Sequence, residues 1–165
     1  MANRHCDESK VIAASPEDLF ALIDDHTRLS SHMSKSSWMM GGGRMEISLD
    51  EGRGKKVGSH IKLSGRAFGI DLFLDEVVTD HQPPRRKAWE TVGKPRLLVI
   101  GKYGMAVDIV PQDNGSVLRV SIDYEVPQTL LGLLFGAAYA RWCVRRMLNE
   151  AADHFAASSR FAAMA

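Results

Sequence analysis

Among the side chains whose types suit acid–base chemistry, we select Tyr103, His60 and Asp71 as candidates. Tyr103 lies in a run of alternating residues and shares a face with Met105 and Val107, so we expect its hydroxyl to point toward an apolar interior. A tyrosine paired there with His60 or Asp71 would supply a general acid and a general base for an enolisable substrate. The alternative for Tyr103 is a core tyrosine whose hydroxyl bonds to the backbone.

The same alternation argues against an inward position for His60 and Asp71, the two candidate partners of Tyr103. His60 lies opposite Ile61 and Leu63, which favours a position at the rim or in solvent. Asp71 lies opposite the apolar face of its own strand, and it turns inward only if the curved sheet reverses the simple alternation, for example at 41–43. The acid–base hypothesis therefore depends on geometry that the sequence does not fix.

The sequence does not contain the motifs that are typical of several other kinds of active or cofactor site. The chain has no nucleophile elbow, Walker loop or dinucleotide fingerprint, and the glycine run 41–43 lacks the following helix that a phosphate cradle uses. Cys6 and Cys143 are far apart and have no metal-ligand spacing with other cysteines or histidines. We therefore expect no metal and no cofactor.

Length and composition predict one domain over residues 1–165. The 21 basic and 20 acidic residues nearly balance, which argues against a general nucleic-acid binder. The longest apolar run is 11 residues, 130–140, and a membrane-spanning helix needs about 20. The polar N-terminus has no signal-peptide pattern, so we expect a cytoplasmic protein, and a homodimer stays open.

The elements that must position these side chains are mostly short alternating strands. A first strand at about 4–13 precedes Ser15 and Pro16, which predict a helix start, and a second short helix is expected at about 28–33. Period-two alternation then predicts five or six strands, because apolar residues occupy one face between turn residues. These strands lie near residues 45–49, 57–63, 68–76, 86–92, 97–110 (one strand or two) and 118–124, with turns at 93–95 and 112–115.

A long helix at about 128–157 follows the last strand. Its first half is apolar throughout, and its second half is amphipathic. A helix of this kind needs a curved sheet to lie in, and the two together tend to enclose an apolar cavity.

Three stretches of the chain resemble the START / polyketide-cyclase (SRPBCC, helix-grip) superfamily. They are VIAASPEDLFALIDD at Val11–Asp25, the hairpins of Gly54–Thr91 with a Pro-Pro turn before a tryptophan, and GSVLRVSIDYEVP at Gly115–Pro127 leading into the last helix. The resemblance implies an α+β fold, in which a curved antiparallel sheet of six to seven strands wraps around the C-terminal helix, with two short helices after the first strand. The gate and latch motifs of the plant hormone receptors and the His/Cys ligands of Rieske oxygenases are both absent from the sequence.

The resemblance and the apolar helix predict a binding protein for a small hydrophobic molecule, such as a lipid, polyketide or isoprenoid. A cyclase or dehydratase that acts in the same cavity is the first alternative, and a chaperone-type partner with an exposed apolar surface and no closed cavity is the second. The two tryptophans among the expected contacts are flat surfaces that also suit a core position. The expected ligand contacts are Trp38, Leu72, Leu74, Trp89, Tyr103, Met105, Val107, Leu131, Leu134 and Phe135.

Overall fold

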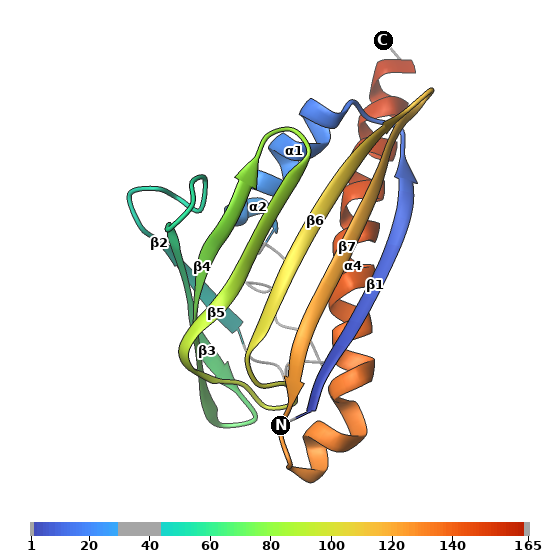
Figure 1. Ribbon diagram of the computed structural model, residues 1–165. Coiled ribbons are helices and arrows are strands. Elements are labelled where there is room, and N and C mark those ends of the chain that lie inside the picture. Colours follow the sequence, from blue (N-terminus) through green and yellow to red (C-terminus); the bar gives the residue numbers. More distant parts are fainter. Residues whose placement is uncertain (1, 30–43, 164–165) are drawn as a thin grey trace.

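A computed structural model describes residues 2–29 and 44–163 of the chain, which form one seven-stranded sheet and three helices (Figure 1). All neighbouring strands pair antiparallel, in the order β1-β7-β6-β5-β4-β3-β2. The predicted α+β helix-grip class is confirmed. The elements are β1 (Ala2–Ile12), α1 (Pro16–Asp24), α2 (His26–Leu29), β2 (Arg44–Leu49), β3 (His60–Ala67), β4 (Ile70–Gln82), β5 (Arg86–Arg96), β6 (Tyr103–Gln112), β7 (Gly115–Val126) and α4 (Leu130–Ala163).

The start of α1 follows the capping pattern that the sequence predicts. The Ser15 hydroxyl oxygen accepts a hydrogen bond from the main-chain N–H of Asp18 at 3.1 Å, and Pro16 occupies the first helical turn. Glu17 and Asp18 add negative charge where the helix dipole favours it. These local interactions fix where α1 begins and therefore where its buried face meets the sheet.

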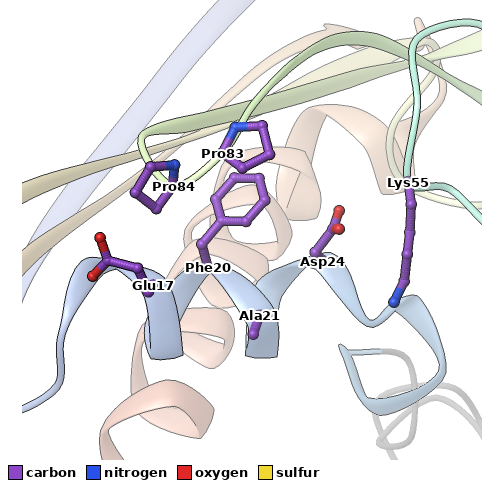
Figure 2. Close-up of a pocket in the computed structure, with 7 residues that line it drawn as sticks. All are labelled: Glu17, Phe20, Ala21, Asp24, Lys55, Pro83 and Pro84. Atoms are coloured by element: carbon purple, nitrogen blue, oxygen red, sulfur yellow. The ribbon is translucent and has the colours of Figure 1, made fainter.

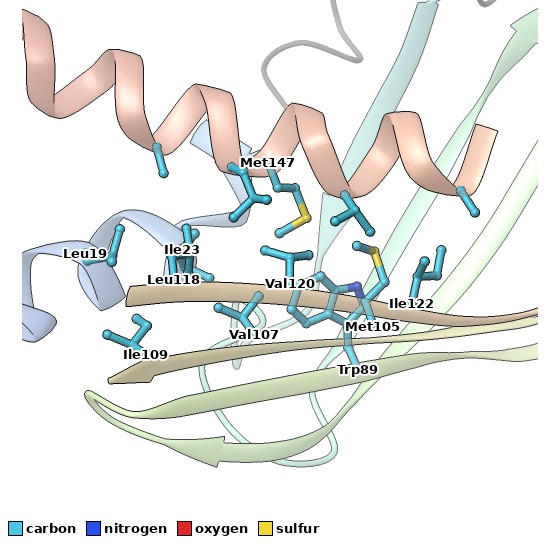
Figure 3. Close-up of a cluster of buried hydrophobic side chains, with 14 of the residues drawn as sticks. Leu19, Ile23, Trp89, Met105, Val107, Ile109, Leu118, Val120, Ile122 and Met147 are labelled. Carbon is cyan, nitrogen blue, oxygen red and sulfur yellow. The ribbon is translucent and has the colours of Figure 1, made fainter. Parts of the chain in front are cut away.

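The helix α4 lies along β1 and β7, at one side of the curved sheet (Figure 1). Where α1 also packs, the space between helix and sheet is filled by a core. Figure 3 shows Leu19 and Ile23 of α1 and Met147 of α4 gathered over Val107 of β6 and Val120 of β7. Burial of such side chains stabilises the fold by about 1.5–3 kcal/mol each.

Two hairpin turns use backbone conformations with positive φ. Phe68 and Gly69 connect β3 to β4 with φ values of 50° and 76°, as in a type I′ turn. Gly115 connects β6 to β7 with a φ of 146°, and a Cβ there would collide with the main-chain oxygen of Ile12. Only glycine fits that close approach of β7 to β1.

Some boundaries differ from the sequence-based predictions. The β5 strand continues through the predicted turn at 93–95 to Arg96, because Gly93 adopts a φ of 69° and a register shift absorbs the extra residues, Pro95 included. Residues 97–102 form a connection rather than part of β6. The α2 helix starts at His26, and α4 extends to Ala163. None of the helices described here is long and apolar enough to cross a membrane.

Candidate functional site

A cavity of about 700 Å³ lies between the sheet and α4. It exists because α4 packs on β1 and β7, whereas β2 to β5 curve away from the helix. Its walls are mainly apolar side chains of β2–β6, of the connection 97–102 and of one stripe of α4. The lining residues are His26, Met45, Ile47, Ile61, Leu63, Ala67, Phe68, Ile70, Leu72, Leu74, Glu76, Trp89, Leu97, Leu98, Val99, Ile100, Tyr103, Met105, Ile122, Leu131, Phe135, Ala138, Tyr139, Trp142, Cys143, Arg146 and Met147.

Exposed apolar side chains mark one end of this cavity. Phe68 and Ile70 of the β3–β4 hairpin and Leu131 and Phe135 of α4 line the cavity and are at least half-exposed. Phe68 is 67% exposed, although its positive φ is unusual for a bulky residue. Large exposed side chains around an apolar cavity are the arrangement expected of an opening through which an apolar molecule passes.

One carboxylic acid, Glu76 of β4, lines the cavity and is only 6% exposed. The Tyr103 hydroxyl donates a hydrogen bond to Glu76 Oε1. Burial raises the pKa of Glu76 to about 7, and hydrogen bonding from Tyr103 and the Trp89 indole opposes that shift. Burial and the Glu76 carboxylate raise the pKa of Tyr103 well above 10. The site therefore holds a carboxyl group that changes charge near neutral pH beside a phenol that stays protonated.

Further polar side chains surround this pair. Cys143 and burial raise the pKa of Tyr139 well above 10, and burial raises the pKa of Cys143 to about 12. His26 lies edge-on to Trp89 with 5.5 Å between the ring centroids, and burial lowers the pKa of His26 to about 3. All three side chains are therefore uncharged near neutral pH, which leaves Glu76 as the titrating group among these cavity residues.

A buried ion pair ties α1 to the sheet next to the cavity. The Lys87 side chain of β5 is fully buried, and its Nζ lies 2.6 Å from Asp24 Oδ1. His81 Nε2 lies 2.9 Å from the same oxygen. Burial lowers the pKa of Lys87, and the hydrogen bond to Asp24 opposes this shift. The pair holds the segment that carries His26 against Trp89.

A second pocket lies between α1 and the β4–β5 turn and has a volume of about 380 Å³. Figure 2 shows Phe20 of α1 beneath Pro83 and Pro84 of the β4–β5 turn, with Asp24 and Lys55 farther along the pocket. This pocket is smaller and more open than the cavity under α4. The cavity under α4 is therefore the candidate site.

Most of the expected ligand contacts line the cavity, namely Leu72, Leu74, Trp89, Tyr103, Met105, Leu131 and Phe135. Val107 does not line it, because it packs in the core between α1, α4 and the sheet. Leu134 does not line it either and is 63% exposed, because it lies beside the inward stripe of the helix. Trp38 lies outside the described residues. The role of these residues in binding stays a prediction.

The structure does not bring His60 or Asp71 to Tyr103. His60 is half-exposed on the outer face of β3, where its Nδ1 lies 2.9 Å from Asp75 Oδ1. Asp71 is exposed on the outer face of β4 and lies 3.5 Å from Arg66 Nε. The simple alternation of each strand holds at these positions, so the carboxylate beside Tyr103 comes from Glu76 instead.

Glu76 is the site residue that the sequence analysis missed, although a signal for it was present. Leu72, Leu74 and Glu76 share one face of β4, so continuing the period-two pattern by one step places the carboxyl group inside. Tyr139 and Cys143 are four residues apart on α4 and continue the stripe that begins with Leu131 and Phe135.

The residues described here contain no group of three or more His, Cys, Asp or Glu side chains placed to hold a metal ion. The polar groups of the cavity are instead a carboxyl group, two hydroxyls, two indoles, an imidazole, a thiol and one guanidinium. Such a set can donate, accept and move protons, and it can orient a mainly apolar molecule.

A curved antiparallel sheet that holds a long C-terminal helix over an apolar cavity is the helix-grip arrangement. The chain belongs to the family described as polyketide cyclase / dehydrase and lipid transport, whose sequence model matches residues 4–160. The superfamily assignment made from the sequence is thereby confirmed. Comparison with curated proteins gives no match.

Solved structures with the same fold share little sequence with this chain. A Thermus thermophilus protein is 15% identical with a TM-score of 0.65, and the match covers 94% of this chain and 99% of that one. Norcoclaurine synthase from Thalictrum flavum is 14% identical with a TM-score of 0.64, over 92% and 86% of the two chains. The di-domain aromatase/cyclase StfQ of the steffimycin biosynthetic pathway is 10% identical with a TM-score of 0.67, over 96% of this chain and 52% of that one. The family and the fold fit a protein that binds hydrophobic ligands or has cyclase activity.

Proposed function

We propose that the protein binds a small hydrophobic molecule, such as a lipid, polyketide or isoprenoid, in the cavity between the sheet and α4. The observation that carries this proposal is the cavity itself, because about 700 Å³ of mainly apolar space is within the range of ligand sites. An empty apolar space of this size would cost stability, and a bound apolar molecule would offset that cost. We assign the ligand contacts to Leu72, Leu74, Trp89, Tyr103, Met105, Leu131 and Phe135.

Two neighbouring alanines of α4 allow a matched test. Ala138 lines the cavity and Ala137 does not, yet both are exposed and tolerate a larger side chain without disturbing the core. We expect Ala138→Trp to lower the affinity for the neutral hydrophobic dye Nile red at least about tenfold, because the indole narrows the cavity. Ala137→Trp should bind as the wild type does. Native mass spectrometry of the purified protein would then identify the mass of any co-purified ligand.

Equal dye binding by both variants would contradict the location of the site. Failure of the wild-type protein to bind the dye or any hydrophobic adduct would contradict the function itself. Circular dichroism and urea unfolding of each variant show whether a loss of binding reflects a loss of fold.

A second candidate function is acid–base catalysis of the cyclase or dehydratase type. The observation in its favour is the Glu76–Tyr103 pair, because a carboxylate with a pKa of about 7 is a suitable base near neutral pH. Once Glu76 has taken up the substrate proton it can donate that proton's hydrogen bond to Tyr103, which frees the Tyr103 hydroxyl to donate to the enolate oxygen. We expect the protein to speed deuterium exchange at the carbon between the carbonyls of a bound 1,3-diketone, with a rate that rises with pH through about 7. Proton NMR would follow the exchange.

Glu76→Gln should lower the exchange rate to that in buffer alone, whereas Glu90→Gln, the same change on the exposed face of β5, should not alter it. An exchange rate equal to that in buffer alone would exclude the catalytic proposal and leave ligand binding intact.

The second alternative from the sequence, a chaperone-type partner, predicts an exposed apolar surface and no closed cavity. The first turns of α4 expose Leu130, Leu133 and Leu134, but a large apolar cavity lies beside them, which favours ligand binding. A cytoplasmic location, no nucleic-acid partner and no cofactor stay predictions from the sequence. A homodimer stays an open alternative.

A further inference from the structure

We propose that the cavity selects hydrophobic molecules whose polar end donates a hydrogen bond, a hydroxyl or an ammonium group, and rejects those that end in a carboxylate. This inference rests on the proposed hydrophobic-ligand function and concerns the polar end of the ligand. The donors, acceptors and charges that the cavity presents carry the inference.

The first step concerns the acceptor. Glu76 is the only carboxylic acid among the described residues that line the cavity, and it is almost fully buried there. A carboxylate offers about four lone-pair positions. Tyr103 and the Trp89 indole engage part of this capacity, and the rest is available to a ligand. A buried acceptor with unused capacity favours a ligand that brings a donor.

The second step concerns the donors around Glu76, several of which already have partners. The Tyr103 hydroxyl proton goes to Glu76, and Tyr139 interacts with the Cys143 thiol. Arg146 donates through Nε to Glu150 at 3.1 Å, and its guanidinium carbon lies 5.5 Å from the centre of the Trp142 ring. A ligand that offers only acceptor atoms would therefore have to displace one of these bonds or bind the other N–H groups of Arg146.

The third step concerns charge. A ligand carboxylate beside ionised Glu76 would place two like charges in a site that water screens poorly, so one of them would have to take up a proton. Asp75 adds negative charge near Glu76. Lys87 is the nearby cation, but its ammonium group is already paired with Asp24.

The remaining titratable groups near Glu76 do not offset this repulsion. The raised pKa values of Tyr103, Tyr139 and Cys143 and the lowered pKa of His26 keep all four side chains neutral near pH 7. Arg146 is then the one group of the described lining with a permanent positive charge, so it is the competing anchor for an acid. The relative affinity of an acid and an alcohol therefore distinguishes the two anchors.

Three ligands with the same chain test the proposal, namely decan-1-ol, decylamine and decanoic acid. Each competes with Nile red for the purified, delipidated wild-type protein and for Glu76→Gln, with Glu90→Gln as the exposed control. At pH 8 we expect the alcohol and the amine to bind at least about tenfold more tightly than the acid to wild type and to Glu90→Gln. In Glu76→Gln the alcohol and the acid should differ by less than about threefold.

A pH series on the wild-type protein tests the same idea without a substitution. The preference for alcohol over acid should weaken from pH 8 to pH 5.5 as Glu76 takes up a proton, while decanoic acid stays largely ionised. Amine affinity should fall over the same interval, whereas alcohol affinity should change little. This contrast separates an ion pair with Glu76 from a neutral hydrogen bond.

An acid that binds wild type as tightly as the alcohol at pH 8 would overturn the inference. An unchanged preference in Glu76→Gln would overturn it as well. In both cases the hydrophobic-ligand function stands, because the ligands still bind. If neither the dye nor any of the three ligands binds, the proposed function fails and the inference with it.

Discussion

The substitution Glu76→Gln should change how the stability of the protein depends on pH. An unfolded glutamate has a pKa of about 4.5, and burial in the cavity raises the value to about 7. The folded state therefore holds the proton more tightly than the unfolded state between these two values. Stability from this group is full below about pH 4.5, falls as the pH rises toward 7, and is constant above that.

The size of the effect follows from the two pKa values. At about 1.4 kcal/mol for each tenfold change in proton affinity, the full loss is about 3 kcal/mol, of which about 2.5 kcal/mol falls between pH 5 and pH 8. The amide of the variant side chain would have no charge to bury. The free energy of unfolding of the variant minus that of wild type should therefore increase by about 2.5 kcal/mol over this interval.

Urea unfolding of delipidated protein at pH 5 and pH 8 measures this difference. For a slope of about 2 kcal/mol per molar urea, the midpoint of the variant should gain about 1 M relative to wild type. Subtracting wild type at each pH cancels the other titrating groups, and removing bound ligand prevents a stabilisation by mass action. A difference that stays constant to within about 0.5 kcal/mol, or one that Glu90→Gln reproduces, would refute the buried-carboxylate explanation.

Two further predictions concern the scaffold around the site. Lys87→Met should lower the free energy of unfolding by about 3–5 kcal/mol because it leaves the Asp24 carboxylate without its buried partner, and adding Asp24→Asn should recover part of that loss in urea unfolding. Gly115→Ala should cost more than about 2 kcal/mol because the new Cβ collides with the Ile12 carbonyl, whereas Gly58→Ala, with a φ of 84° and open space around it, should cost about 1 kcal/mol. Equal losses for the two glycine variants would show that backbone conformation, and not the collision, sets the cost.

Local patterns in the sequence predicted most of the fold. Ser15 and Pro16 start α1 by interactions within one turn, and alternating apolar residues define the strands because successive side chains point to opposite faces. The apolar stretch after Val126 predicted α4, because it is followed by apolar residues at helical spacing. The prediction failed at β5, where a bulge at Gly93 lets the strand pass through a stretch that has the composition of a turn.

The candidate site was predicted less completely. Tyr103 and Met105 were placed on the inner face by alternation, and both line the cavity. Val107 has the same parity, yet it is in the packed core, because parity gives the face of a strand and not the distance between that face and α4.

The sequence by itself determined most of the elements, the inner and outer faces of the strands and the family, because these depend on short-range patterns along the chain. Only the tertiary structure decided where the sheet leaves α4 and a cavity opens. It also decided that the carboxyl group beside Tyr103 is that of Glu76 and not of Asp71. The physical reason is that curvature, burial and pKa depend on contacts between strands and helix that are far apart in sequence.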